Sequence, residues 1–285
     1  MAKKNRKERK EKKKRIIIPF VERPFEGLSA ETSLIAMREI LPLATLPATT
    51  TKDHGSENII LATVLPNMAG ALRRKDGVLL VAMQTVMNSG DVSLDVASRI
   101  LAGLELKPGD AYTSGDQPDP EGPRLGDIIE EFGEMQLEEE PAFWLAEEDL
   151  NTPESQQALK ETRESMVPCK EIETVTGAYW CRMSREFLRW VRPEPRDQVL
   201  DGLARLRAAG KEHWGEGSRF IGAFRSLGMS IPVWELARGT EADELDKPLK
   251  DFEPVLEAAI ADTTPLTTEE KRARAGLVSR QVTLR

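Results

Sequence analysis

Four arginines recur within one short segment of the second half of the chain, and guanidinium groups bind phosphates and carboxylates. They are Arg182, Arg185, Arg189 and Arg192. If the segment forms a helix over 179–191, the four lie within an arc of about 80°, because each residue advances about 100° around the axis. Such a row suits an RNA backbone or an acidic protein surface. The alternative is a solvated face whose arginines pair with this protein's own acids.

A glycine-containing loop at 215–219 is the second candidate site, and it reads Gly-Glu-Gly-Ser-Arg. If this loop opens a helix over 219–227, the backbone N–H groups of Gly217 and Ser218 can bind an anion, and Arg219 can add its guanidinium group. The acid inside the loop weakens this interpretation. The alternative is a structural turn in which Ser218 caps the helix.

The first fifteen residues carry the densest positive charge of the chain, a net +8. Its ten bases are Lys3, Lys4, Arg6, Lys7, Arg9, Lys10, Lys12, Lys13, Lys14 and Arg15. A segment this charged cannot bury a core, so we expect a disordered tail. Such a tail binds phosphates by releasing counterions, without reading a sequence.

The rest of the chain is acidic. The whole sequence carries −8, so the 270 residues after the tail carry −16. Residues 119–149 contain twelve acids and one base. Because their spacing is not typical of a paired-carboxylate or metal site, we expect a solvated acidic surface. That surface suits a basic protein partner or the protein's own tail.

Other catalytic or metal-binding groups are few. The chain has two histidines, His54 and His213, and two cysteines, Cys169 and Cys181, twelve residues apart. Neither type occurs as a close pair, so we expect no metal site and no cofactor, and we interpret the cysteines as reduced structural thiols. The glycine-rich phosphate-binding motifs, the zinc-protease motif and the hydrolase serine motif are all missing from the sequence.

The first half of the chain is expected to form a small α+β unit. An arm at 16–21 and a strand at 44–51 are both expected at a sheet edge, the latter because it contains a proline. Two helices are expected, one capped by Ser29 and ending before Pro42, the other over 93–104. Further strands are expected at 59–65 and 78–86, and we expect the sheet to be antiparallel.

A proline- and glycine-rich stretch at 113–124 predicts a boundary near residue 115. We therefore expect a tail over 1–15, a first subdomain over 16–115 and a second over 116–285, with five tryptophans forming the second core. Two helices are expected to carry the arginines. A further helix is expected to begin at Thr152-Pro153, and three more are expected over 196–209, 254–261 and 269–279. Expected strands cover 172–175 and 231–236.

Three stretches carry a family resemblance: 22–28 (ERPFEGL), 184–190 (SREFLRW) and 215–220 (GEGSRF), the last running on to 232–234 (PVW). Together with the basic start, they resemble an actinobacterial domain-of-unknown-function family of similar length. The resemblance covers nearly the whole chain and implies a bacterial cytosolic protein. It brings no catalytic residue with it.

The leading functional hypothesis is a cytoplasmic accessory protein that binds RNA or the ribosome through the tail and the arginine row, and is not an enzyme. No apolar run approaches the length of a membrane span, so no membrane partner is expected. A second hypothesis is an adaptor that binds a basic protein through the acidic middle segment. A third is a small-molecule enzyme whose C-terminal site combines Arg219, His213 and a carboxylate. The sequence leaves the oligomeric state open.

Overall fold

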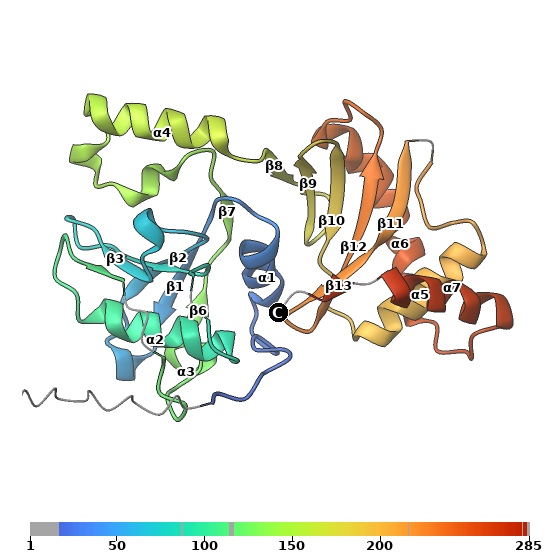
Figure 1. Ribbon diagram of the computed structural model, residues 1–285, viewed down its shortest axis with the longest axis horizontal. Coiled ribbons are helices and arrows are strands. Elements are labelled where there is room, and N and C mark those ends of the chain that lie inside the picture. The colour runs from blue at the N-terminus through green and yellow to red at the C-terminus, as the bar shows by residue number, and fades with distance from the viewer. Residues whose placement is uncertain (1–16, 87, 114–116, 216, 281, 284–285) are drawn as a thin grey trace, which may run out of the picture.

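The computed structural model describes residues 17–86, 88–113, 117–215, 217–280 and 282–283. The expected tail over 1–15, with its ten bases, lies outside these residues. The described chain forms two sheets that lie side by side, with helix α1 (Glu31–Glu39) between them (Figure 1). Helices and strands of both sheets confirm the expected α+β class. Among the described residues, no helix is long and apolar enough to cross a membrane.

The first sheet has the strand order β5-β3-β4-β2-β1-β6, and β7 pairs with β1 beside β6. The strands are β1 (Ala44–Thr50), β2 (Asn58–Ala62), β3 (Ala71–Arg73), β4 (Leu79–Ala82), β5 (Ala111–Tyr112), β6 (Ile129–Phe132) and β7 (Gln136–Leu137). The expected strands are confirmed, but the sheet is mixed, because β2 and β4 run parallel. A hairpin from β2 to β4 would make these two strands antiparallel. The chain instead passes through β3 first, so β4 runs in the same direction as β2.

The prediction that a proline confines β1 to an edge is wrong. β1 pairs with β2 on one side and with β6 and β7 on the other. The carbonyl of Pro47 accepts a hydrogen bond from Gly133 N at 2.8 Å, so the side of Pro47 that lacks an N–H faces the gap between β6 and β7. A central strand tolerates the proline there, because neither β6 nor β7 places a carbonyl at this gap that would need a hydrogen bond from the N–H that proline lacks.

Helix α1 has five of its nine residues buried, because both sheets pack against it. Leu34, Ile35, Ala36 and Met37 are consecutive and fully buried. Toward the first sheet, Gln84 Nε2 donates to Met37 O at 2.7 Å. Toward the second, the backbone at Gly177 comes so close that a Cβ there would lie 2.8 Å from the α1 side chain of Thr32. The expected helix is confirmed, although it begins after Ala30 without a side-chain cap from Ser29.

Helix α2 (Val92–Leu104) packs against the first sheet and confirms the second expected helix. Asp91 caps it by accepting a hydrogen bond from Leu94 N at 3.1 Å. The short α3 (Leu125–Ile128) leads into β6. The arm at 17–21 forms no strand, and Val21 N donates to Gly90 O at 2.9 Å in the loop before α2.

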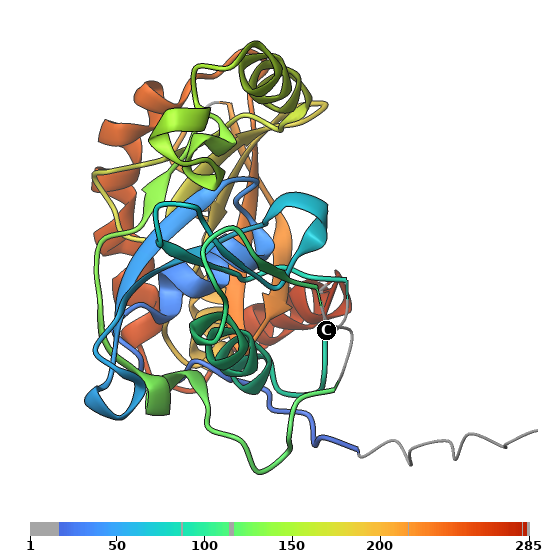
Figure 2. The same ribbon diagram turned by 90° about the vertical axis from the view of Figure 1, so that its left-hand side faces the viewer.

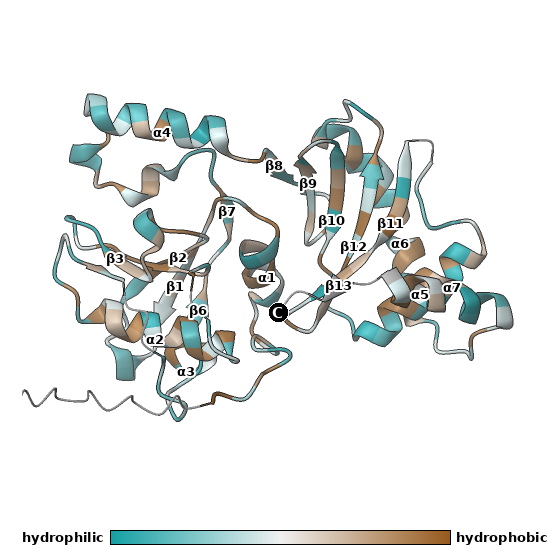
Figure 3. Cartoon of the chain, in the orientation of Figure 1, coloured by the Kyte–Doolittle hydropathy of each residue, from teal (hydrophilic) through white to brown (hydrophobic). Residues whose placement is uncertain are grey.

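The chain crosses from the first sheet to the second over 138–168. This crossing holds two short 3₁₀ turns, η3 (Pro141–Trp144) and η4 (Glu147–Asp149), and helix α4 (Pro153–Ser165). Thr152 caps α4 as expected, accepting from Ser155 N at 3.2 Å. Helix α4 is largely hydrophilic and stands at the outer end of the molecule (Figures 2 and 3). Because β6 and β7 belong to the first sheet, the change of sheet comes after residue 137, later than the boundary expected near residue 115.

The second sheet has the strand order β13-β11-β12-β10-β9-β8. Its strands are β8 (Cys169–Glu171), β9 (Ala178–Arg182), β10 (Glu186–Trp190), β11 (Ser218–Ser226), β12 (Met229–Leu236) and β13 (Val282–Thr283). One face packs against α1. The other is covered by α5 (Arg196–Ala208), α6 (Asp246–Ala261) and α7 (Thr268–Arg280).

Four of the five tryptophans belong to the core under these three helices, as the sequence predicts. Trp180, Trp190 and Trp234 are fully buried there, and Trp214 packs against Trp234 with a ring separation of 5.3 Å. Trp144 instead packs on the first sheet, where its Nε1 donates to a backbone carbonyl at 3.0 Å.

Two expected helices are wrong. Residues 179–191 form the β9–β10 hairpin, and 219–227 form β11 up to its turn. In β9 both faces of the strand are buried, so consecutive apolar residues hide the alternation that normally reveals a strand. In β11 a bulge between Phe220 and Gly222 interrupts the alternation. A strand also forms at Cys169–Glu171 in place of the expected 172–175.

The other helical predictions in the second half hold. Helix α5 ends before Gly210, whose φ of +65° stops it as expected. The capping box of α7 is present, since Thr267 N donates to Glu270 at 2.7 Å and Glu270 N donates to Thr267 Oγ1 at 3.3 Å. Helix α6 begins eight residues earlier than expected, so Pro254 lies inside it. The extended segment 231–236 is part of β12.

Candidate functional site

The β9–β10 hairpin divides the four predicted arginines between the two faces of the second sheet, so the expected row does not exist. Arg182 and Arg192 lie on the face covered by α5, α6 and α7. The guanidinium carbon of Arg182 lies 4.7 Å from the ring centre of Trp180, and that of Arg192 lies 5.2 Å from Trp190. Their carboxylate partners are Glu186 and Glu241 for Arg182, and Glu194 for Arg192.

Three arginines lie on the opposite face, beyond the part that packs against α1. Arg219 on β11 is directly opposite Glu235 on β12, which is in turn opposite Phe187 on β10. Arg189 follows two residues along the same face of β10, and Arg185 reaches Glu235 from the turn of the hairpin. We call Arg185, Arg189 and Arg219, together with Glu235, the arginine face. It combines residues from both candidate sites of the sequence.

Glu235 holds two of the three guanidinium groups. Arg219 Nη2 donates to Glu235 Oε2 at 2.5 Å, and Arg185 Nη1 donates to Oε1. The bond from Arg219, joined by that from Arg185, holds the pKa of Glu235 below its ordinary value, so the carboxylate stays charged. Arg219 and Arg185 remain accessible, with 72% and 55% of their side chains exposed.

Arg189 completes the face without an acid of its own. Among the described residues it forms no ion pair with a carboxylate, and its Nη2 contacts the thioether sulfur of Met183 at 3.6 Å. The arginine face therefore presents three guanidinium groups against one carboxylate. Exposed Arg–Glu pairs are weak, so an anion can take the place of Glu235 at Arg185 and Arg219. Guanidinium groups bind phosphate oxygens through two parallel hydrogen bonds.

The predicted anion-binding loop does not open a helix. Ser218 is the first residue of β11, and its hydroxyl donates to Gly215 O at 3.2 Å and accepts from Trp214 N at the same distance. Gly217 adopts a φ of +90°, and its carbonyl accepts from Ala237 N at 2.6 Å. These polar groups close the loop as a turn at Gly217, but Ser218 caps no helix, because residues 218–226 form β11.

The constellation expected for an enzyme does not form around Arg219. His213 Nδ1 accepts a hydrogen bond from Gly215 N at 3.3 Å within its own loop. No hydrogen bond joins His213 to Arg219 in the part of the chain that the structure describes, and Arg219 is bound to Glu235. Within the same described residues, no group of three or more His, Cys, Asp or Glu side chains is placed to hold a metal ion.

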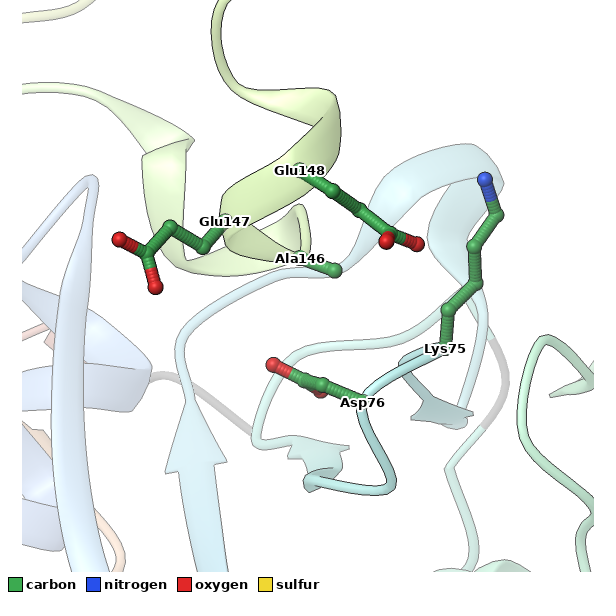
Figure 4. Close-up of a pocket in the computed structure, with 5 residues that line it drawn as sticks. All are labelled: Lys75, Asp76, Ala146, Glu147 and Glu148. Atoms are coloured by element: carbon green, nitrogen blue, oxygen red, sulfur yellow. The ribbon is translucent and has the colours of Figure 1, made fainter.

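The acidic middle segment borders an open groove of about 490 Å³ beside the first sheet. Its lining comes from the turn between β3 and β4 and from the start of η4, namely Lys75, Asp76, Ala146, Glu147 and Glu148 (Figure 4). Lys75 Nζ pairs with Asp149 at 2.8 Å, and this contact raises the pKa of Lys75. Glu148 points toward Lys75, whereas Glu147 points away from it. The groove is thus a charged surface with three carboxylates.

The comparisons with known proteins assign no role to the arginine face or to the groove. Comparisons with curated proteins and with solved structures found no match. A comparison with protein families matched residues 24–285, which is nearly the whole chain. The match includes all three stretches that carry the resemblance, except the first two residues of the stretch 22–28. The chain therefore belongs to DUF5926, a family of unknown function.

Proposed function

We propose that this is a cytoplasmic accessory protein of actinobacteria that binds RNA, free or in the ribosome, through residues 1–15 and the arginine face. The observation that carries the proposal is the segregation of charge. Fifteen residues hold a net +8, whereas the other 270 hold −16. A basic segment attached to an acidic body attracts phosphates at one end while the body repels them, which restricts contact to the basic parts.

The arginine face supports this proposal because it offers phosphates a second surface within reach. Arg225, at the far end of β11, pairs with Glu22 beside the arm at 2.6 Å. Arg219 lies six residues away along the same strand, which is about 20 Å at 3.3 Å per residue. Residues 1–16 can span at most about 55 Å. One strand of RNA can therefore contact the N-terminal segment and the arginine face together.

The proposal is tested by measuring RNA affinity as a function of salt, using fluorescence anisotropy of a labelled single-stranded RNA. If the N-terminal segment engages 5–8 phosphates, the logarithm of the affinity falls with the logarithm of salt concentration with a slope of about −3.5 to −5.6. Deleting residues 1–15 removes most of this slope. A variant with the same fifteen residues shuffled is the matched control, and it keeps the slope because counterion release does not read a sequence. Failure of the full chain to bind at low salt overturns the proposal.

A second candidate function is an adaptor that binds a basic protein. The observation in its favour is the groove with the exposed carboxylates of Asp76, Glu147 and Glu148. Its test is binding of a labelled lysine-rich peptide to the full chain and to a variant with Glu147→Gln and Glu148→Gln. Equal binding by the two proteins removes the groove from consideration.

A further inference from the structure

Cys169 and Cys181, twelve residues apart in sequence, are directly opposite each other on the antiparallel strands β8 and β9. Two backbone hydrogen bonds flank them, from Arg182 N to Pro168 O and from Ile172 N to Ala178 O, each 2.9 Å. Since hydrogen-bonded and non-hydrogen-bonded pairs alternate along such a ladder, the cysteines occupy a non-hydrogen-bonded pair. Opposite Cα atoms are about 4.5 Å apart at such a position, within the range of about 4.4–6.8 Å that disulfides require.

The two thiols belong to directly opposite residues and lie on the same face of the sheet. They share a hydrogen bond, which lowers the pKa of Cys181 and raises that of Cys169. The guanidinium group of Arg189, from the arginine face, also lowers the pKa of Cys181. A nearby cation favours the thiolate, which is the form that attacks a disulfide. The pair therefore combines directly opposite thiols with a positive charge beside them.

Access differs between the two cysteines in a way that sets an order of events. Cys181 is 1% exposed, whereas Cys169 lies on the edge strand β8 and is partly exposed. A small disulfide in solution can reach Cys169. Cys181 can then be reached only by a sulfur attached to Cys169.

We propose that Cys169 and Cys181 are a redox modification site, which forms a reversible cross-strand disulfide by exchange with a low-molecular-weight disulfide. First, Cys181 loses a proton to solvent, and Cys169 passes its own proton to Cys181 through their shared hydrogen bond as its sulfur attacks one sulfur of the small disulfide, breaking the S–S bond and releasing one thiolate. Then Cys181 loses its proton and attacks the Cys169 sulfur, releasing the second thiolate. Two protein thiols are oxidised, and one small disulfide is reduced to two thiols.

The expected bond is reversible for a geometric reason. A Cα separation of about 4.5 Å lies at the short end of the range for disulfides, and departures from the preferred geometry make the bond easier to reduce. Exposure of one sulfur acts in the same direction, because a thiol can attack it. The bond would tie the edge strand β8, which follows the crossing segment, to β9.

The test treats the folded full chain with glutathione disulfide, blocks free thiols under denaturing conditions and measures the intact mass. The proposal predicts a monomer whose mass is lower by two hydrogen atoms, with no glutathione and no blocking group attached. A reductant restores the original mass and both free thiols. Because the chain has two cysteines, an internal disulfide can only join this pair. No reaction, or glutathione remaining on the wild-type protein, overturns the proposal.

Two single variants separate the steps. In Cys181→Ser the second sulfur is missing, so a glutathione adduct accumulates on Cys169. In Cys169→Ser the remaining thiol is buried, so the adduct forms at least tenfold more slowly. Circular dichroism establishes that each variant is folded, and Cys181→Ala replaces Cys181→Ser if the serine variant unfolds. Equal rates of adduct formation in folded Cys169 and Cys181 variants contradict the proposed order and overturn the mechanism.

Discussion

Two glycines inside helices of the second half are expected to respond in opposite ways to the same substitution. Gly202 lies in α5, and a Cβ there would meet the N, Cα and Cγ1 atoms of Ile260 on α6, each at 2.8 Å. Gly276 lies in α7, and a Cβ there would have no atom within 4 Å. Both positions have ordinary helical backbone, so the surroundings decide the difference.

The magnitudes follow from two opposing effects. Alanine stabilises a helix relative to glycine by about 0.5–1 kcal/mol, because glycine loses more backbone freedom on folding. Overpacking a tight contact destabilises by about 1–3 kcal/mol, and two of the three atoms at Gly202 are backbone atoms that cannot rotate away. We therefore expect Gly276→Ala to raise the free energy of unfolding by about 0.5–1 kcal/mol, and Gly202→Ala to lower it by about 1–2 kcal/mol.

Urea denaturation followed by tryptophan fluorescence measures both effects, since the core beside α5 and α6 contains Trp180, Trp190 and Trp234. The wild-type protein gives the reference midpoint, and Gly276→Ala is the matched control for helix propensity. If Gly202→Ala raises the midpoint as much as Gly276→Ala does, then α5 and α6 are not in the close contact described above, and the reasoning fails.

Three further outcomes are expected. Changing Arg185, Arg189 and Arg219 together to alanine lowers the magnitude of the salt slope of RNA binding by up to about 2, at about 0.7 per phosphate. Arg182→Ala, on the opposite face, is the control and leaves the slope unchanged. Equal slopes for the two variants would show that the arginine face does not contact RNA. Glu235→Gln strengthens RNA binding at pH 7, because it removes the carboxylate that competes with phosphate for Arg185 and Arg219. The folded-state pKa of Glu235 is held below its ordinary 4.5, so the stability from its ion pairs is present above pH 4.5 and is lost as the pH falls further. The urea midpoint of the wild type therefore exceeds that of Glu235→Gln at pH 7, and this difference shrinks in acid. Thr152→Ala removes the cap of α4 and lowers helix stability by about 1 kcal/mol, seen as faster hydrogen exchange of the α4 amides, and unchanged exchange shows that the cap contributes nothing.

Local signals in the sequence predict the elements whose reasons are local. The capping threonine and the proline after it mark the start of α4, and Gly210 marks the end of α5. Both depend on residues within one turn of the helix terminus. For the same reason the α+β class, which needs only the presence of both kinds of element, can be read from the sequence.

The candidate site could not be predicted, because long-range strand pairing creates it. Arg189 and Arg219 share a face only because β10 and β11 both pair with β12, which places Glu235 on the same face of the middle strand. The helix expected over 179–191 instead placed Arg182 and Arg192 beside Arg185 and Arg189, which the hairpin separates. Spacing in the sequence reveals the face of an element only when the type of element is right.

The sequence does not predict the pairing of the cysteines, for a related reason. A separation of twelve residues suggests no contact, and only the register of β8 against β9 places Cys169 opposite Cys181. The sequence did contain a usable signal, since both residues flank a short segment with a glycine, at Gly177, that can reverse the chain.

The burial of α1 between the two sheets has a consequence for synthesis of the chain. This helix is made first, but Met229 and Ile231, which belong to the same core, are added about 190 residues later, and at about 5–20 residues per second that takes roughly 10–40 s. For most of this interval, the apolar surface of α1 that faces the second sheet has no native partner, because Gly177 and Tyr179, the earlier partners, are added about 140 residues after α1. The nascent protein therefore depends on whatever shields that surface at the ribosome, and slower translation of the second half would lengthen its exposure to aggregation.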